Sequence, residues 1–167
     1  MTRQPEHYAR SQYYNFKVVS TTSHSEQQTE AVRRFFEEVW NRGDLTVLDE
    51  LVCMDVTYED RVWHEHKLPG RRRLRNMIQE VKHGYPDFTF NLEHVLARDD
   101  SLVCMAHWTA TCTNQGDFLD RPASGRISRL SGMHMFVFDR DARIVEITCY
   151  RQPTDEERSQ HFGWEGL

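Results

Sequence analysis

Residues 88–113 read FTFNLEHVLARDDSLVCMAHWTATCT, and this stretch decides the fold class. Phe88, Phe90 and Leu92 alternate with polar residues, and residues 102–113 resume the alternation. A period of two is typical of a half-buried β-strand. The Asp99-Asp100 pair between the two runs favours a turn. The stretch therefore predicts two neighbouring strands, and residues 126–138 and 144–151 predict two more.

Upstream of this stretch the period changes to that of a helix. A single helical face collects Val32, Phe35, Phe36, Val39 and Trp40 at the spacing i, i+3, i+4, i+7, i+8. Ser25 and Gln28 predict a capping box at the start of this helix, and Gly43 predicts its end.

Shorter elements follow. Asp44 is a candidate cap for a short second helix, and residues 55–60 predict a brief extended run. Gly70 is expected to open a third helix, which ends before Pro86. Near the end of the chain, Thr154 and Glu157 predict a second capping box.

Helices followed by a run of strands predict an α+β domain with the helices packed on one face of an antiparallel sheet. A curved sheet of this kind leaves a cavity between its concave face and the helices, where small molecules often bind. We expect one domain over residues 25–167, and an N-terminal extension over 1–24, where no period is sustained.

Composition excludes several classes of protein. A formal charge of -5 and a pI near 6.0 argue against a nucleic-acid-binding protein. No stretch reaches about 20 apolar residues, and the N-terminus lacks the apolar core of a signal peptide, so we expect a cytoplasmic protein with no membrane partner. The four cysteines contain no CxxC motif and are expected to be free thiols.

Several local strings, in this order, resemble the SnoaL-like polyketide cyclase family of the nuclear-transport-factor-like superfamily. They are AVRRFFEEVWNRGDLTVLDELV (31–52), DVTYED (55–60), PGRRRLRNMI (69–78), GDFLDRPASGR (116–126) and FVFDRDARIVE (136–146). The resemblance implies a cone-shaped fold, a curved antiparallel sheet with helices packed on its concave face. It also implies a small-molecule substrate, a homodimer, and catalysis without a metal or coenzyme.

The resemblance implies a cyclase chemistry in which a carboxylate removes a proton from carbon beside a carbonyl. Burial raises the pKa of such a carboxylate, and a hydrogen-bond donor stabilises the enolate oxygen. His134 falls at the active-site histidine of the family, whereas Cys149 falls where the family carries its catalytic aspartate. A thiol is a poor base for carbon acids, so we expect Glu59 to take that role, facing the cavity with Tyr58 and Asp60 on the opposite face.

Further residues are candidates for substrate contact. Trp63, Trp108 and Tyr150 are expected to form an apolar wall, and His64 to border the cavity mouth. The full candidate set for substrate binding is Tyr58, Trp63, His64, Trp108, Cys149 and Tyr150. Val103, Met105 and His107 share one face of their strand with threonines, and this face is a candidate dimer surface.

Other interpretations remain open at this point. His64 and His66 could bind a metal, although polar loop residues are the commoner outcome for a lone HxH. The arginine run at 71–75 could hold an anion or simply be a solvated face. We predict a cyclisation, isomerisation or rearrangement of a polyketide-like or terpenoid-like molecule; the alternatives are epoxide opening by hydrolysis and a non-catalytic binding module.

Overall fold

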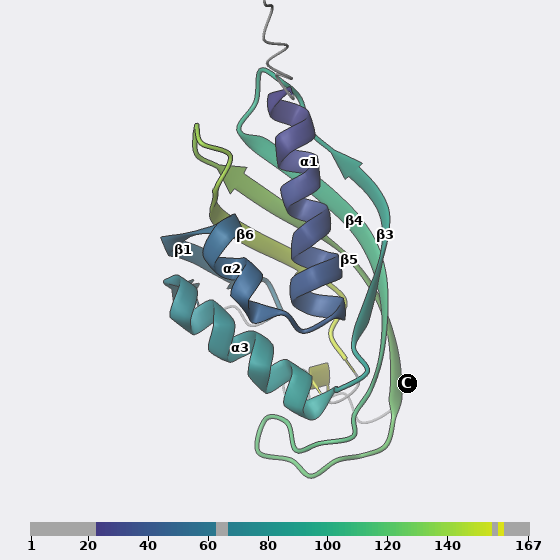
Figure 1. Cartoon of the computed structure of the whole chain (residues 1–167). Coiled ribbons are helices and arrows are strands. Elements are labelled where there is room, and N and C mark those ends of the chain that lie inside the picture. The colour runs from purple at the N-terminus through teal and green to yellow at the C-terminus, as the bar shows by residue number, and fades with distance from the viewer. Residues whose placement is uncertain (1–22, 63–66, 155–156, 159–167) are drawn as a thin grey trace, which may run out of the picture.

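The computed structural model describes residues 23–62, 67–154 and 157–158 of the chain (Figure 1). The helical elements are α1 (His24–Arg34), the π-helical segment η1 (Phe35–Asn41), the 3₁₀ turn η2 (Leu45–Val47), α2 (Leu48–Leu51) and α3 (Arg71–Gly84). The strands are β1 (Val52–Asp60), β2 (Lys67–Pro69), β3 (Thr89–Leu96), β4 (Val103–Thr113), β5 (Ile127–Phe138) and β6 (Ile144–Arg151).

The strands form one curved sheet in the order β2-β1-β6-β5-β4-β3. All neighbouring strands are antiparallel except β1 and β6, which run parallel. Figure 1 shows the helices α1, α2 and α3 on one side of the sheet, with the long strands β3, β4 and β5 bending past them. The predicted α+β fold with helices on the concave face is confirmed, although the sheet is not wholly antiparallel.

The core lies between the helices and the inner face of the sheet. On β4 the inward residues Cys104, Ala106, Trp108, Ala110 and Cys112 are all buried. Their neighbours in sequence point outward, as the period of two requires. From the helical side, η1 buries Phe35, Phe36, Val39 and Trp40 against this face. The helical and strand patterns in the sequence therefore converge on one apolar layer.

The ends of the elements agree with most of the predicted signals. Asp44 accepts a hydrogen bond from the Thr46 amide, and Gly70 precedes α3 with a φ of 86°, a conformation that favours glycine. The first capping box was predicted two residues late, because it is formed by Ser23 and Glu26. Among the described residues no helix is long and apolar enough to cross a membrane.

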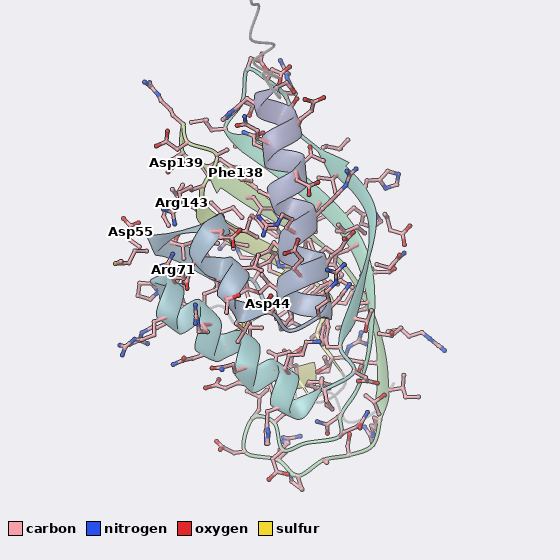
Figure 2. All side chains as sticks on the ribbon, in the orientation of Figure 1. Asp44, Asp55, Arg71, Phe138, Asp139 and Arg143 are labelled. Carbon is pink, nitrogen blue, oxygen red and sulfur yellow. The ribbon has the colours of Figure 1, made fainter. Side chains whose placement is uncertain are left out.

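The start of the arginine run joins three elements. Arg71 donates hydrogen bonds to the carbonyl oxygens of Asp49 and Val52, and Arg143 donates to the same two atoms. Figure 2 labels both arginines on the side of the molecule where α3 begins. Arg75 pairs with the Asp49 carboxylate at 2.9 Å. These contacts tie α3 and the β5–β6 hairpin to the end of α2, which gives Arg71 and Arg75 a structural role.

Candidate functional site

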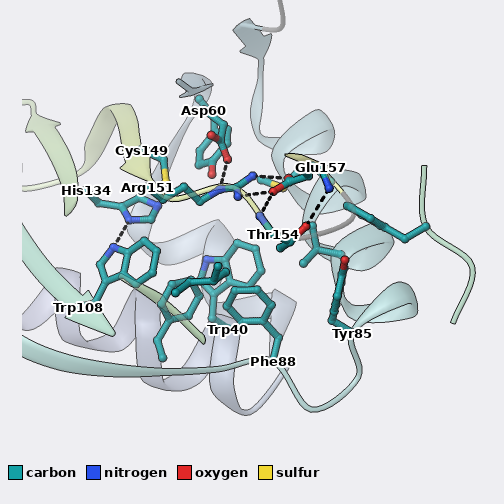
Figure 3. A pocket seen from close by; sticks show the side chains of 16 residues that line it. Trp40, Asp60, Tyr85, Phe88, Trp108, His134, Cys149, Arg151, Thr154 and Glu157 are labelled. Atoms are coloured by element: carbon teal, nitrogen blue, oxygen red, sulfur yellow. Dashed lines mark hydrogen bonds and ion pairs between the residues drawn. The ribbon is translucent and has the colours of Figure 1, made fainter. Parts of the chain in front are cut away.

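A cavity lies between the inner sheet face and the helices and opens to solvent; its empty space, counted together with the open solvent at its mouth, is about 490 Å³. Its walls are mainly aromatic and aliphatic, with a row of polar side chains along one side (Figure 3). The lining residues are Trp40, Tyr58, Asp60, Met77, Val81, Tyr85, Phe88, Phe90, Trp108, Phe118, Leu130, His134, Cys149, Arg151, Thr154 and Glu157. Such a lining, apolar with few polar groups, is typical of a site for an organic molecule.

His134 lies in this cavity at the middle of β5. The Trp108 indole Nε1 donates a hydrogen bond of 2.7 Å to His134 Nδ1 (Figure 3). In the neutral imidazole one nitrogen accepts and the other carries the proton. Because Nδ1 accepts, the proton resides on Nε2, which has no hydrogen-bond partner among the described residues. The neutral His134 therefore offers one N–H donor.

The surroundings of His134 keep it neutral. The residue is 1% exposed and contacts a set of aromatic rings: those of Phe36, Tyr58, Phe90, Trp108 and Phe136. Burial, with a smaller contribution from the positive charge of Arg151, lowers the pKa of His134 to about 3. At neutral pH the side chain is consequently an electrically neutral donor, suited to an oxygen that gains negative charge.

A glycine allows Trp108 to reach His134. Gly132 faces Trp108 across the β4–β5 pair. A Cβ atom at position 132 would lie 2.6 Å from Trp108 Cζ2 and 2.5 Å from the Tyr150 carbonyl oxygen. No side chain larger than hydrogen fits that space without displacement of its neighbours. Gly132 therefore helps to set the imidazole tautomer through the position of the indole.

Two carboxylates share one arginine at the other end of the polar row. Arg151 Nε donates to Asp60 Oδ2 at 2.7 Å, while its Nη1 and Nη2 donate to Glu157 at 2.7 and 2.6 Å (Figure 3). Glu157 also accepts from the Thr154 amide at 2.7 Å, and its own amide donates to the Thr154 hydroxyl. This confirms the predicted capping box and shows that it anchors the turn after β6 to the cavity.

Asp60 is buried, with 3% of its surface exposed. Its second oxygen, Oδ1, accepts from the Val62 amide at 2.9 Å. Burial raises the pKa of Asp60, although Arg151 and the Val62 amide act in the opposite direction. The arginine neutralises only one of the two carboxylates, so the group carries a net negative charge when both are ionised. A buried carboxylate with a raised pKa is the kind of group that serves as a general base near neutral pH.

The prediction that Glu59 faces the cavity is wrong. Tyr58 and Asp60 line the cavity instead, and Glu59 is directed away from it, where its carboxylate pairs with Arg61 at 2.6 Å. The two inward residues are two apart, as the alternation of a strand requires. The sequence correctly predicts that residues of this strand alternate between two faces, but the residues predicted for the inner face are those of the outer face.

The other predicted residues divide into three groups. Tyr58, Trp108 and Cys149 line the cavity with His134. Tyr150 does not, because it points to the outer face, 44% exposed, with Arg61 over its ring. Trp63 and His64 lie outside the described residues.

Cys149 is buried and lines the cavity with Tyr58. Burial raises the pKa of the Cys149 thiol well above its ordinary value. A thiol with a raised pKa is a poor nucleophile and a poor metal ligand, because both tasks need the thiolate. In the described part of the chain, no cluster of three or more histidine, cysteine or carboxylate side chains is arranged to hold a metal ion.

Asp60, Cys149 and His134 occupy one row across three neighbouring strands. Cys149 on β6 is the register partner of Asp60 on β1 and also of His134 on β5. Because strands in a sheet lie about 4.8 Å apart and β6 lies between β1 and β5, the backbones of Asp60 and His134 are roughly 10 Å apart. The row brings a carboxylate and an imidazole to the same level of the cavity.

Besides Asp60, sequence reasoning missed three polar or aromatic residues of the site: Trp40, Arg151 and Glu157. Trp40 was assigned to the core face of the first helix, which is correct, but nothing in its spacing indicates that its indole nitrogen lies in a cavity. Arg151 ends a strand and Glu157 belongs to a recognised capping box. An arginine at the end of a buried strand, with a carboxylate six residues later, is a signal that could have suggested their ion pair.

The curved sheet, covered by helices over an aromatic cavity, defines a class of cone-shaped α+β domains. Within this class the chain belongs to the SnoaL-like polyketide cyclase family, whose model matches residues 30–153. The match covers the strings that suggested the family.

Solved structures agree on the fold. A protein from Jannaschia sp. CCS1, provisionally described as a SnoaL-like polyketide cyclase, superposes with a TM-score of 0.71 at 20% identity, covering 78% of this chain and 89% of its own. IdmH from Streptomyces antibioticus, provisionally described as a polyketide cyclase, gives 0.63 at 23% identity, covering 75% and 92%. Bal32a from a soil-derived mobile gene cassette gives 0.64 at 20% identity, covering 77% and 91%. No protein with curated annotation matches this sequence.

Proposed function

We propose that the protein is an acid/base enzyme that acts on a polyketide-like or terpenoid-like ketone, and that Asp60 is its base. The observation that carries the proposal is the row Asp60–Cys149–His134. In the family the catalytic aspartate stands at the position of Cys149. In this chain the carboxylate is that of Asp60 on the neighbouring strand β1, where Asp60 is the register partner of Cys149. It lines the same cavity as His134.

The proposed reaction begins with the ketone oxygen on His134 Nε2–H and the adjacent carbon near Asp60. The Asp60 carboxylate removes a proton from that carbon, and the electron pair of the C–H bond moves onto the oxygen as an enolate. The neutral imidazole stabilises the new charge. If the ketone is β,γ-unsaturated, the enolate is a dienolate, and return of the proton from Asp60 to its γ carbon gives isomerisation. Attack of the enolate carbon on a second carbonyl of the same molecule gives ring closure, with the proton passing from Asp60 to the new alkoxide.

Arg151 limits the basicity of Asp60, and Glu157 counteracts it. An arginine beside a single carboxylate would hold the pKa of that carboxylate low. Here the charge of Glu157 acts on Asp60 in the opposite direction and engages two of the arginine nitrogens. We infer that this arrangement leaves Asp60 ionised but still able to accept a proton near neutral pH. The steps require no cofactor.

Exchange of carbon-bound protons tests the proposal without knowledge of the substrate. The protein is incubated with 2-tetralone in D₂O, and loss of the proton signal beside the carbonyl is followed by NMR. The wild-type chain should accelerate exchange over buffer, and Asp60→Asn should lose at least about a hundredfold of that acceleration, within the range that a general base supplies. Equal acceleration by both proteins would reject Asp60 as the base.

A second candidate reaction is the opening of an epoxide by water. The specific observation in its favour is that Arg151 holds two buried carboxylates in one cavity. One carboxylate could activate water while the other, protonated, donates to the epoxide oxygen. Turnover of an epoxide in ¹⁸O-labelled water distinguishes the reactions: labelled diol supports hydrolysis, and an unlabelled rearranged product supports the ketone chemistry.

We also propose a homodimer formed through the outer face of the sheet. Exposed apolar side chains meet there across neighbouring strands, where Leu96 pairs with Met105 and Met133 pairs with Tyr150. A contiguous apolar sheet face is unfavourable in water and is commonly covered by a partner. A second copy presents the same face, so the contact can be symmetric.

A further inference from the structure

Trp40 carries a polar atom that the fold does not use. The side chain is 4% exposed and lines the cavity, and its indole Nε1–H has no acceptor among the described residues. Buried indole nitrogens usually find a hydrogen-bond partner, because an unpaired buried donor is costly. In Figure 3 Trp40 and Phe88 lie across the cavity from the polar row that includes His134 and Arg151.

The position of Trp40 is fixed from both sides. Trp40 belongs to the π-helical segment η1, and such segments are frequent at functional sites. The next residue, Asn41, clamps β3 through two hydrogen bonds: its Nδ2 donates to the Phe90 carbonyl at 2.9 Å, and its Oδ1 accepts from the Phe90 amide at 2.8 Å. The indole also packs on Phe88 and Phe90, with ring centroids 5.8 and 5.3 Å away. The unused donor is therefore held in place.

Trp40 and His134 together present two N–H donors to one apolar cavity. Both rings contact the ring of Phe90, with ring centroids 5.3 and 6.3 Å away, so the two side chains belong to one region of the cavity wall. Neither donor has an acceptor in the described part of the chain. The net negative charge of Asp60, Arg151 and Glu157 disfavours an anion, which leaves neutral carbonyl oxygens as the fitting acceptors.

We propose that Trp40 is a specificity-determining residue, and that the ligand is a neutral ring compound whose two carbonyl oxygens accept from His134 and Trp40. The proposal rests on the proposed function in that it takes this cavity to be the substrate site. It adds a second anchor, which orients the ligand so that the carbon beside the His134-bound carbonyl faces Asp60.

A pair of probes that differ only in their acceptors tests the role of Trp40. The probes are 2,3-dimethyl-1,4-naphthoquinone and 2,3-dimethylnaphthalene, and their affinities are measured by equilibrium dialysis. The wild-type chain should prefer the quinone. Replacement of the Trp40 indole by benzothienylalanine, which keeps the shape and removes the N–H, should weaken quinone binding by about three- to tenfold, the range for one hydrogen bond. Hydrocarbon binding should change by less than twofold.

Genetically simpler variants provide the control. Trp40→Phe removes the donor together with some volume, whereas Met77→Leu alters another part of the cavity wall and removes no donor. The ratio of quinone to hydrocarbon affinity should fall in Trp40→Phe and stay at the wild-type value in Met77→Leu. Equal losses for both probes in the Trp40 variants, or no quinone preference in the wild type, would overturn the donor role while leaving the ligand site intact. Binding of neither probe, together with no exchange of 2-tetralone, would reject the proposed function and this proposal with it.

Discussion

At the scale of single residues, the site depends on the state of one imidazole. His134 donates because Trp108 occupies its other nitrogen and because burial among aromatic rings keeps it uncharged. Sequence comparison with the family was sufficient to select His134. The tautomer could not be predicted, because it depends on Trp108 from another strand and on the absence of a side chain at Gly132.

The neutral state of His134 predicts a dependence of stability on pH. Its pKa is about 3 in the folded chain and near 6.5 when unfolded. Below pH 6.5 the unfolded state therefore binds a proton that the folded state does not, and stability falls as the pH decreases toward 3, by up to about 1.4 kcal/mol per pH unit. In His134→Gln this contribution is absent.

Urea unfolding at pH 7.5, 6.0 and 5.0 measures the effect. The difference in free energy of unfolding between wild type and His134→Gln should shrink as the pH falls, since other titrating groups are common to both proteins. A constant difference across this range would show that His134 titrates normally in the folded chain.

Which face of β1 points into the cavity also could not be predicted from the local sequence. Alternation established that only one of Glu59 and Asp60 could face inward, but it contains no information on which. The choice is made by a nonlocal contact, because Asp60 meets Arg151 from β6, ninety-one residues later in the chain. A pairing irregularity between Val52 and Thr57 also shifts the strand relative to β6, and no local pattern reports such a shift.

At the scale of elements, the strands and helices were largely predictable because their periods are written in the sequence. The residues predicted for the fourth strand, 144–151, coincide with β6, and Gly70 starts α3 as expected. The π-helical character of η1 was not predictable. The spacing of Phe35, Phe36, Val39 and Trp40 fits an ordinary helix, and nothing in it distinguishes the wider π turn that the structure contains.

The turn after β6 is the element that connects fold and site. Glu157 joins Thr154 to Arg151, so Glu157→Gln should weaken both the cap and the ion pair. We expect a loss of about 2 kcal/mol in the free energy of unfolding, since one partner of a buried charged pair is removed. Hydrogen exchange at the Thr154 and Arg158 amides, which are bonded within this turn, should become at least tenfold faster.

Glu146→Gln is the matched control for this prediction. Glu146 lies on β6, where its carboxylate accepts a long hydrogen bond of 3.5 Å from the Thr148 hydroxyl. Its substitution should leave the exchange of the turn unchanged. If Glu157→Gln exchanges as slowly as the control, the turn is held by other contacts.

At the scale of the whole molecule, the two faces of the sheet differ in what they contact. The inner face encloses the cavity, and the outer face presents apolar side chains, among them Met133 at 39% exposure. The proposed dimer predicts a species of about twice the 19.9 kDa chain mass in light scattering. Met133→Glu should shift this species to the monomer, because a charge buried in the contact is unfavourable.

Met54→Glu serves as the comparison, because Met54 is 76% exposed on β1, which is separated from Met133 on β5 by the strand β6. This variant should remain dimeric. A monomeric wild type, or equal behaviour of the two variants, would rule out the outer face as the dimer contact.

We propose that the catalytic carboxylate of this cone is Asp60 on β1, beside the position of Cys149 on the neighbouring strand β6. Asp60→Asn and Glu59→Gln offer the most direct measurement, because the two carboxylates are adjacent in sequence and lie on opposite faces of β1. We predict that exchange of 2-tetralone protons is lost in Asp60→Asn and retained within about threefold in Glu59→Gln. Loss of proton exchange in Glu59→Gln, with full exchange activity in Asp60→Asn, would contradict the assignment of Asp60 as the base.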